Sequence, residues 1–143
     1  MVTDRPISFS VSHSGEHALV AVVDDRAPLG IDVERVRPRA RLEALAARAL
    51  ARDELAAWRA RPANERLAAF LQLWTRKEAY LKATGTGITT SMRAVPVAPA
   101  GWTCVDLDVG PDARAALAIA LPAATVALER WHPALSASAG TAS

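Results

Sequence analysis

The segment from Glu65 to about Ala83 constrains the fold more than any other part of this 143-residue chain. Its apolar residues recur at helical spacing and fall on one stripe of a helix: Leu67, Phe70, Leu71, Trp74 and Leu81. Asn64 suits the N-cap of this helix, and Gly85 suits its C-cap. The pattern predicts an amphipathic helix whose apolar face is turned toward a core.

Shorter patterns surround this helix. Residues 7–13 alternate apolar and small polar side chains, and residues 17–23 are rich in valine, so together they predict a β-hairpin. A second, alanine- and leucine-rich helix is expected from about Ala40 to Ala60. Further strands are expected at residues 29–34, 95–97, 102–109, 115–121 and 125–131. The fold class is therefore α+β: an antiparallel sheet packed against two helices in one domain, residues 1–132, followed by a disordered tail, residues 133–143.

Composition excludes several classes of protein. Hydrophobic residues make up 51% of the chain and charged residues 22%, which is typical of globular proteins. The net charge of +2 is too small to argue for nucleic acid. The single cysteine, Cys104, excludes an intramolecular disulfide and fits the cytoplasm. No apolar run is long enough to cross a membrane, and the N-terminus does not resemble a signal peptide.

Glu78 is the most unusual residue of the helix, because it falls inside the apolar stripe. A carboxylate on a core-facing side is costly unless it is paired or bound to a metal ion. Lys82 lies one turn further along, at the edge of the same face. The ordinary alternative is an exposed Glu–Lys pair at i,i+4, but the apolar surroundings of Glu78 weigh against it.

Asp32 and Glu34 form a second group of acids, in the strand expected at residues 29–34. Residues two apart in a strand point to the same face, so the two carboxylates lie side by side and repel each other unless a cation is present. The alternative is a solvated face of an edge strand. Together with Glu78, they offer three oxygen ligands of the kind that Mg²⁺ prefers, whereas no Cys/His cluster suggests zinc.

Ser12 and His13 stand next to each other in the first strand. Adjacent residues of a strand point to opposite faces, so they cannot form a Ser–His dyad with each other. Hydrogen bonding to an anion is a better role for them. The alternative is a histidine and a turn serine at the end of a strand, without function.

Three runs of the chain, taken in order, resemble the 4′-phosphopantetheinyl transferase superfamily: residues 9–14 (Phe-Ser-Val-Ser-His-Ser), residues 30–34 (Gly-Ile-Asp-Val-Glu) and residues 74–82. The third run has the family form W-x-x-K-E-A-x-x-K and is followed by Gly85, Thr86, Gly87 and Ile88. Because the Ser-His-Ser run precedes Gly-Ile-Asp, the order resembles that of the Sfp-type branch.

The resemblance implies a reaction and a set of residues. The family transfers 4′-phosphopantetheine from coenzyme A to a serine of an acyl or peptidyl carrier protein and releases 3′,5′-ADP. Asp32, Glu34 and Glu78 match its Mg²⁺ ligands. The other matching positions are Lys82 on the coenzyme A diphosphate, His13 and Ser12 on phosphate, and Lys77 and Trp74, whose roles are less defined.

Glu54 lies 20 residues before Trp74, where Sfp-type members carry a glutamate discussed as the base that deprotonates the carrier serine. Two alternatives stay open. The base could instead be the metal-bound shell acting through water. Glu54 could also be an ordinary exposed helical glutamate.

The resemblance covers about residues 7–131, which is only part of a two-lobed Sfp-type enzyme. Three explanations compete for the missing first lobe: a homo-oligomer that replaces it, a fragment, or a degenerate relative. A non-catalytic half-enzyme that binds coenzyme A or a carrier protein is therefore the main alternative function. The third hypothesis is an arginine-rich interaction domain without ligand chemistry, which requires Glu78 to be exposed and salt-bridged.

Four arginines follow the acidic strand directly: Arg35, Arg37, Arg39 and Arg41. Carrier proteins are acidic around their serine, so this run could steer a carrier to the site. The alternative is a solubilising start of a helix.

Overall fold

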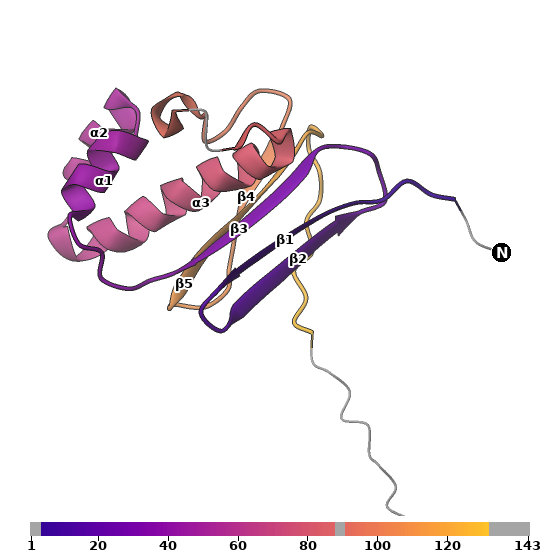
Figure 1. Ribbon diagram of the computed structural model, residues 1–143, viewed down its shortest axis with the longest axis horizontal. Helices are drawn as coiled ribbons and strands as arrows, with labels where there is room; N and C mark the ends of the chain where they lie inside the picture. The colour runs from indigo at the N-terminus through magenta and orange to yellow at the C-terminus, as the bar shows by residue number, and fades with distance from the viewer. Residues whose placement is uncertain (1–3, 88–90, 132–143) are drawn as a thin grey trace, which may run out of the picture.

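The computed structural model describes residues 4–87 and 91–131. Within them the chain forms two sheets and a group of helices (Figure 1), which confirms the α+β class. The strands are β1 (Ser8–Ser14), β2 (His17–Val23), β3 (Leu29–Arg35), β4 (Thr103–Leu107) and β5 (Ala113–Ile119). The helices are α1 (Leu42–Ala49), α2 (Arg52–Arg59) and α3 (Arg66–Thr84), with short 3₁₀ turns η1 (Ala63–Glu65) and η3 (Met92–Ala94).

The expected single sheet is two sheets. Strands β1 and β2 form the predicted hairpin, while β3, β5 and β4 form an antiparallel sheet with β5 in the middle. Serine hydroxyls of β1 join the two sheets by accepting hydrogen bonds from backbone N–H groups of β3: Ser10 from Ile31 at 3.1 Å, Ser12 from Val33 at 3.2 Å and Ser14 from Arg35 at 3.0 Å. The alternating serines of residues 8–14 thus replace a backbone ladder.

Helix α3 lies across one face of the β3–β5–β4 sheet (Figure 1), and glycine allows it to come unusually close. A Cβ atom on Gly30 would lie 1.9 Å from the carbonyl oxygen of Ala79 in α3. Small buried residues line the same contact, namely Ala79, Ala116 and Ala118. Because Asp32 and Glu34 share the face of Gly30, this close approach brings them up against α3.

The opposite face of β3 is buried too. Leu29 and Ile31 pack with Leu117 and Ile119 of β5 and with Ala21 of the hairpin. Strand β3 is therefore enclosed between α3 on one side and the hairpin on the other. The alternative of a solvated edge face fails for Asp32, which is only 6% exposed.

The expected helix from Ala40 to Ala60 is wrong, because the chain breaks it into α1 and α2. Leu50 and Ala51 between them have extended backbone. Leu50 is completely buried in the core formed with Trp58 and Phe70. The carboxylate of Glu54 accepts a hydrogen bond from the Ala51 N–H at 2.8 Å and so caps the start of α2. Core packing and this cap outweigh the helix propensity of alanine.

Other boundaries also differ from expectation. Asn64 lies in η1 rather than capping α3, which begins at Arg66 without a side-chain cap, whereas Gly85 is the left-handed C-cap that was predicted. Residues 95–97 and 125–131 form no strand. Ile88 and the predicted tail lie outside the described residues. In the described part of the chain, no helix is both long and apolar enough to cross a bilayer.

Candidate functional site

Asp32 is the centre of the site. Lys82 of α3 donates hydrogen bonds from Nζ to Asp32 Oδ1 at 2.9 Å and to the carbonyl oxygen of Ile31 at 3.0 Å. Ser12 donates to the same Oδ1 at 3.1 Å. The second oxygen, Oδ2, is buried and has no partner among the described residues. Burial raises the pKa of Asp32 although Lys82 lowers it, so the carboxylate is under-compensated.

Glu78 faces this group from α3. Its side chain makes no hydrogen bond or ion pair with any described residue. Burial raises the pKa of Glu78, the negative charge of Asp32 raises it further, Lys82 lowers it, and Glu34 adds a smaller increase. The site thus contains a half-buried carboxylate that has no hydrogen-bond or ion-pair partner in residues 4–87 and 91–131, next to two other acids.

Glu34, the third acid of the site, forms an ion pair with an arginine. Arg39 donates from Nη2 to Glu34 Oε2 at 2.9 Å, and both side chains are about a quarter exposed, at 28% and 26%. As the side chains stand, no three acidic, histidine or cysteine residues in the described ranges converge closely enough to hold a metal ion. The donor set still fits a hard divalent cation, because Asp32 Oδ2 and Glu78 have no hydrogen-bond donor among the described residues and Lys82 is the one cation that acts on both.

A cavity of about 500 Å³ opens beside Glu78. Its charged lining residues are Glu78 and Lys82, and Trp74, Leu81 and Met92 give it an apolar wall. Trp74 packs against Phe70 with ring centroids 5.9 Å apart, which anchors that wall in the core. A ligand here would meet a charged end and an apolar side.

The Ser-His pair divides between two faces, as strand alternation predicts. Ser12 is 6% exposed, and its hydroxyl donates a hydrogen bond to Asp32 and accepts one from the backbone of β3. It therefore orients Asp32 instead of facing solvent. His13 is exposed on the outer face of the hairpin and does not join the carboxylates.

Lys77 and Glu54 form a separate buried pair. Lys77 is 0% exposed, its Nζ lies 2.7 Å from Glu54 Oε2, and it donates to the carbonyl oxygen of Met92 at 2.9 Å. The pair ties α3 to α2 and to the η3 turn. Sequence reasoning named both residues but did not predict that they bind each other.

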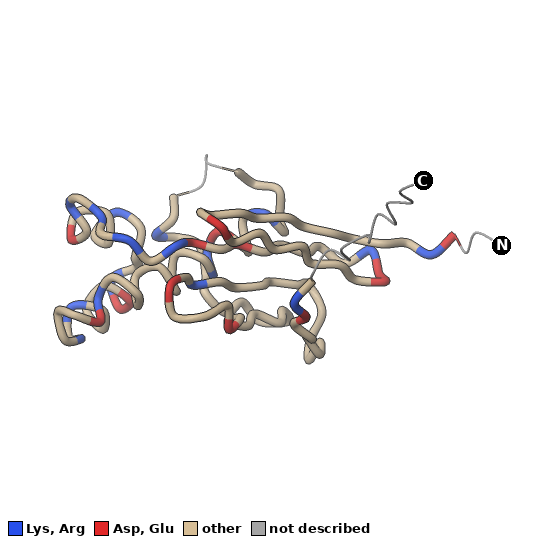
Figure 2. The backbone as a smooth tube through the Cα atoms, turned by 90° about the horizontal axis from the view of Figure 1, so that it is seen from below, with Lys and Arg blue, Asp and Glu red and all other residues tan. Residues whose placement is uncertain are grey.

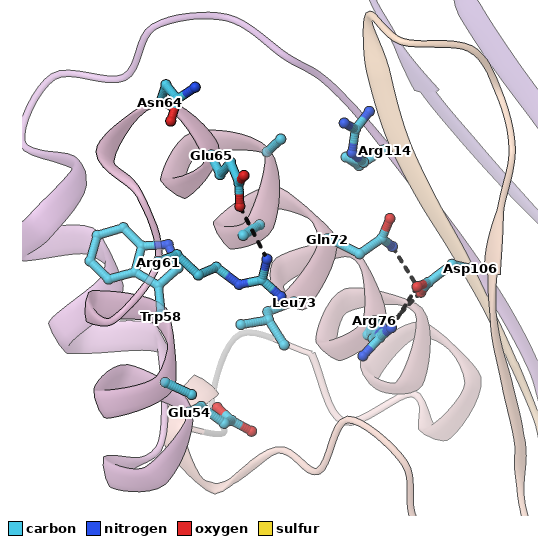
Figure 3. A pocket seen from close by; sticks show the side chains of 13 residues that line it. Glu54, Trp58, Arg61, Asn64, Glu65, Gln72, Leu73, Arg76, Asp106 and Arg114 are labelled. Carbon is cyan, nitrogen blue, oxygen red and sulfur yellow. Dashed lines mark hydrogen bonds and ion pairs between the residues drawn. The ribbon is translucent and has the colours of Figure 1, made fainter.

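Glu54 also lines a different cavity, of about 720 Å³, shown in Figure 3. This cavity uses Ala68, Gln72 and Arg76 of α3, which lie on the helix face away from Glu78. Figure 3 shows Gln72 and Arg76 meeting at Asp106 of β4, with bonds of 2.9 Å and 2.6 Å. The structure thus brings together Ser12, Asp32, Glu34, Glu78 and Lys82, but keeps Glu54, Lys77 and His13 apart from them.

Arg39 is the site residue that sequence reasoning misplaced. It was grouped with Arg35, Arg37 and Arg41, which are exposed, whereas Arg39 turns back onto Glu34. The spacing of five residues across an irregular segment gave no periodic signal for this contact. Only the course of the chain after β3 reveals it.

Comparison with known proteins defines the class. The sequence profile of the 4′-phosphopantetheinyl transferase superfamily matches residues 28–131. The 4′-phosphopantetheinyl transferase HetI of Nostoc sp. is 38% identical over 122 residues, covering 78% of this chain and 51% of that protein. The 4′-phosphopantetheinyl transferase psf-1 of Bacillus pumilus is 43% identical over 82 residues, covering 57% of this chain and 33% of that protein.

A solved structure has a similar fold. The crystal structure of Thermotoga maritima holo-[acyl-carrier-protein] synthase matches with a TM-score of 0.52 and 23% identity, covering 64% of this chain and 61% of that one. The chain belongs to the 4′-phosphopantetheinyl transferase superfamily. It spans about half the length of HetI and a third of psf-1.

Proposed function

We propose that this chain is a Mg²⁺-dependent transferase that moves 4′-phosphopantetheine from coenzyme A to a serine of an acyl or peptidyl carrier protein. The observation that carries the proposal is the under-compensated pair of Asp32 and Glu78, beside a cavity with one apolar wall. The motifs that built the family resemblance supply all of these residues. The proposed setting is the cytoplasm, in keeping with the unpaired Cys104.

The reaction needs alignment and charge neutralisation more than covalent help. The serine oxygen forms a bond to the phosphorus nearer pantetheine, the bond from that phosphorus to the bridging oxygen breaks, and 3′,5′-ADP leaves. Asp32, Glu34 and Glu78 would hold Mg²⁺, which when bound would draw negative charge from the diphosphate. Ser12 fixes the orientation of Asp32, and the apolar wall suits the uncharged pantetheine chain.

Lys82 takes part in two stages of this proposal. In the free protein it neutralises Asp32, about one third of its side chain being exposed. With a cation on Asp32, the ammonium would be free to contact the diphosphate, in the role that the family resemblance implies. The flexible stem of lysine permits such a change of partner.

The proton of the carrier serine has two candidate acceptors. Glu54 keeps one oxygen, Oε1, outside its contacts with Lys77 and Ala51, but it lines the other cavity. That position favours the alternative, in which a water molecule held among the carboxylates takes the proton. Glu54 stays a candidate base for the measurement described below.

Mass spectrometry of an apo carrier protein tests the activity. The purified chain, coenzyme A and Mg²⁺ should add one phosphopantetheine mass to the carrier. Glu78→Ala should abolish the gain, whereas Glu16→Ala, which removes an exposed acid in the hairpin turn, should leave it unchanged. Equal transfer by Glu78→Ala and the unsubstituted chain would refute the proposed site.

The alternatives predict other results. A half-enzyme that only binds would take up coenzyme A in calorimetry but leave fatty-acid, polyketide and peptide carriers unmodified. The arginine-rich interaction domain required an exposed, salt-bridged Glu78, and Glu78 is half-buried without an ion pair among the described residues. That third hypothesis is therefore disfavoured.

We also propose that two copies associate through the outer face of the hairpin. Strands β1 and β2 carry no Lys, Arg, Asp or Glu (Figure 2). Five large apolar side chains in these strands or directly before β1 are half or more exposed: Ile7, Phe9, Val11, Val20 and Val22. Phe9 lies opposite Val22 and Val11 opposite Val20, so the patch is continuous. A contiguous exposed apolar patch of this kind is typical of a surface that binds another protein.

A second copy would also cover His13, which lies on the same outer face, and would supply the bulk that the longer relatives have. Light scattering tests this: the Phe9→Ser/Val20→Ser variant should be a monomer, and Leu128→Ser, at another exposed apolar position, should stay dimeric. A monomeric unsubstituted chain at 100 µM, on the order of a weak dimer's dissociation constant, would refute the association.

The exposed arginines remain candidates for docking an acidic carrier. Arg35, Arg37 and Arg41 point to solvent around the segment between β3 and α1, where Figure 2 shows a run of basic positions. Arg39 drops out of this set because it binds Glu34. Arg37→Glu should therefore slow carrier modification at low salt without changing coenzyme A affinity.

A further inference from the structure

Arg39 differs from its neighbouring arginines in where its charge goes. Arg35, Arg37 and Arg41 are exposed, but Arg39 folds back and contacts Glu34 through a single nitrogen, Nη2. No periodic element fixes this contact, because the segment between β3 and α1 is irregular. The irregular segment after β3 therefore brings the guanidinium of Arg39 to Glu34, one of the three acids of the site.

The contact between Arg39 and Glu34 is incomplete. Arg39 Nε is buried and has no partner in the part of the chain that the structure describes. A guanidinium binds a carboxylate most strongly through two parallel bonds, and a buried N–H without an acceptor carries a desolvation cost. Arg39 therefore holds Glu34 with less than the strength that a bidentate pair would have.

The acidic and basic side chains of the site do not balance in charge. Three carboxylates, Asp32, Glu34 and Glu78, face two basic groups, Lys82 and Arg39, which leaves one surplus negative charge. That surplus agrees with the orphaned Asp32 Oδ2 and the unpaired Glu78. A doubly charged cation in place of Arg39 would balance the group, with Lys82 still present.

We propose that Arg39 is a built-in competitor of the divalent cation: it occupies Glu34 in the free protein and must release it before all three carboxylates can bind the ion. This inference rests on the metal site of the proposed function and adds its regulation by a residue of this chain. Arg39 is a positioning residue for Glu34 and lowers the affinity of the site for the cation.

Calorimetric titration with Mn²⁺ or Mg²⁺ alone, without coenzyme A or carrier, measures this competition. Arg39→Gln should tighten cation binding about tenfold, the equivalent of ~1.4 kcal/mol. Arg37→Gln is the matched control, because it removes the same charge two residues away from an exposed position. Titrating in 0.5 M salt suppresses long-range electrostatic effects but not the direct contact.

A double-variant cycle separates the contact from a general charge effect. In a Glu34→Gln background, Arg39→Gln should change cation affinity no more than Arg37→Gln does. Equal affinity of Arg39→Gln and the unsubstituted chain, an effect that survives in Glu34→Gln, or no cation binding by either protein would each overturn the inference.

These outcomes are distinguishable from failure of the proposed function. If the chain transfers no phosphopantetheine but Arg39→Gln binds the cation more tightly than Arg37→Gln, the inference holds without the transferase. If transfer occurs and the two variants have equal cation affinity, the inference alone fails.

Discussion

Replacing Gly30 by alanine tests how α3 and β3 bring the site residues together. The added Cβ would lie 1.9 Å from the Ala79 carbonyl oxygen and 2.7 Å from the Ala83 nitrogen. An ordinary carbon–oxygen contact is ~3.3 Å, so the helix would have to retreat by about 1.4 Å. Both obstructing atoms are backbone, so no side-chain rotation relieves the collision. The shift would strain the bonds from Lys82 to Asp32 and to the Ile31 carbonyl.

Overpacking of a tight core contact costs about 1–3 kcal/mol, and a backbone collision belongs at the upper end. At about 4 °C per kcal/mol for a chain of this size, the melting temperature of Gly30→Ala should fall by about 12 °C. Thermal unfolding followed by circular dichroism measures this. The reasoning is refuted if Gly30→Ala melts within 3 °C of the unsubstituted chain, a shift below ~1 kcal/mol.

Two controls isolate the collision. Gly101→Ala puts a methyl group where no atom lies within 4 Å, but at a φ of +80°, so it should cost only about 1 kcal/mol of backbone strain. Adding Ala79→Gly to Gly30→Ala should not restore stability, because the clash involves the Ala79 backbone and not its side chain. Rescue by Ala79→Gly would show that the close approach has another cause.

Three further outcomes are expected. In EDTA, Glu78→Gln should be more stable than the unsubstituted chain at pH 7, and the difference in stability should vanish near pH 4. Because the pKa of Glu78 is raised in the native state, the native protein holds this proton to a higher pH than the unfolded chain does. The stability that the proton contributes is therefore complete below the ordinary pKa of 4.5 and is lost as the pH rises through the native pKa. Ser12→Ala should lower the free energy of unfolding by about 1–3 kcal/mol, because the buried Val33 N–H loses its acceptor and Asp32 loses a donor; chemical denaturation measures it. Glu54→Gln leaves the buried charge of Lys77 without its carboxylate, so it should lower the free energy of unfolding more than Lys77→Met does. If Glu54 is the base, the double variant Glu54→Gln/Lys77→Met should regain stability without regaining transfer.

The fold class could be predicted because it rests on local periodicity, whereas the three site motifs were grouped by their resemblance to a known family. Alternation predicts that Ser12 and His13 lie on opposite faces and that Asp32 and Glu34 share one face, but not that this face meets α3. The helical stripe predicts that Glu78 lies on the apolar face of its helix, and the structure adds that this face turns it toward Asp32. What these predictions share is that a spacing of two or four residues decides them.

The errors lie where tertiary contacts overrode local preference. No local sequence pattern predicts that the helix is interrupted at Leu50, whose side chain is buried in the core. Nor does one predict that Glu54 caps α2 and also binds Lys77. The separation into two sheets depends on serine hydroxyls that replace a backbone ladder, which alternation alone does not distinguish from ordinary pairing. Arg39 was grouped by sequence proximity, and its partner is set by the turn of the chain.

The two lysines of the chain have different surroundings: one is bound in a closed ion pair, and the other is able to change its partner. The chain has 17 basic residues, and only Lys77 and Lys82 are lysines, so each stands against a strong preference for arginine. Lys77 is enclosed, with one carboxylate and one carbonyl as partners, and a compact ammonium fits there where a planar guanidinium would not. Lys82 is partly open to solvent beside the cavity, and its partner Asp32 keeps an unused oxygen. Lys77→Arg should therefore destabilise folding by about 2 kcal/mol or more through overpacking, whereas Lys82→Arg should fold normally and alter only cation and anion binding. Equal stability losses in the two variants, measured by thermal unfolding, would mean that both lysines serve the core and that neither is free to change its partner.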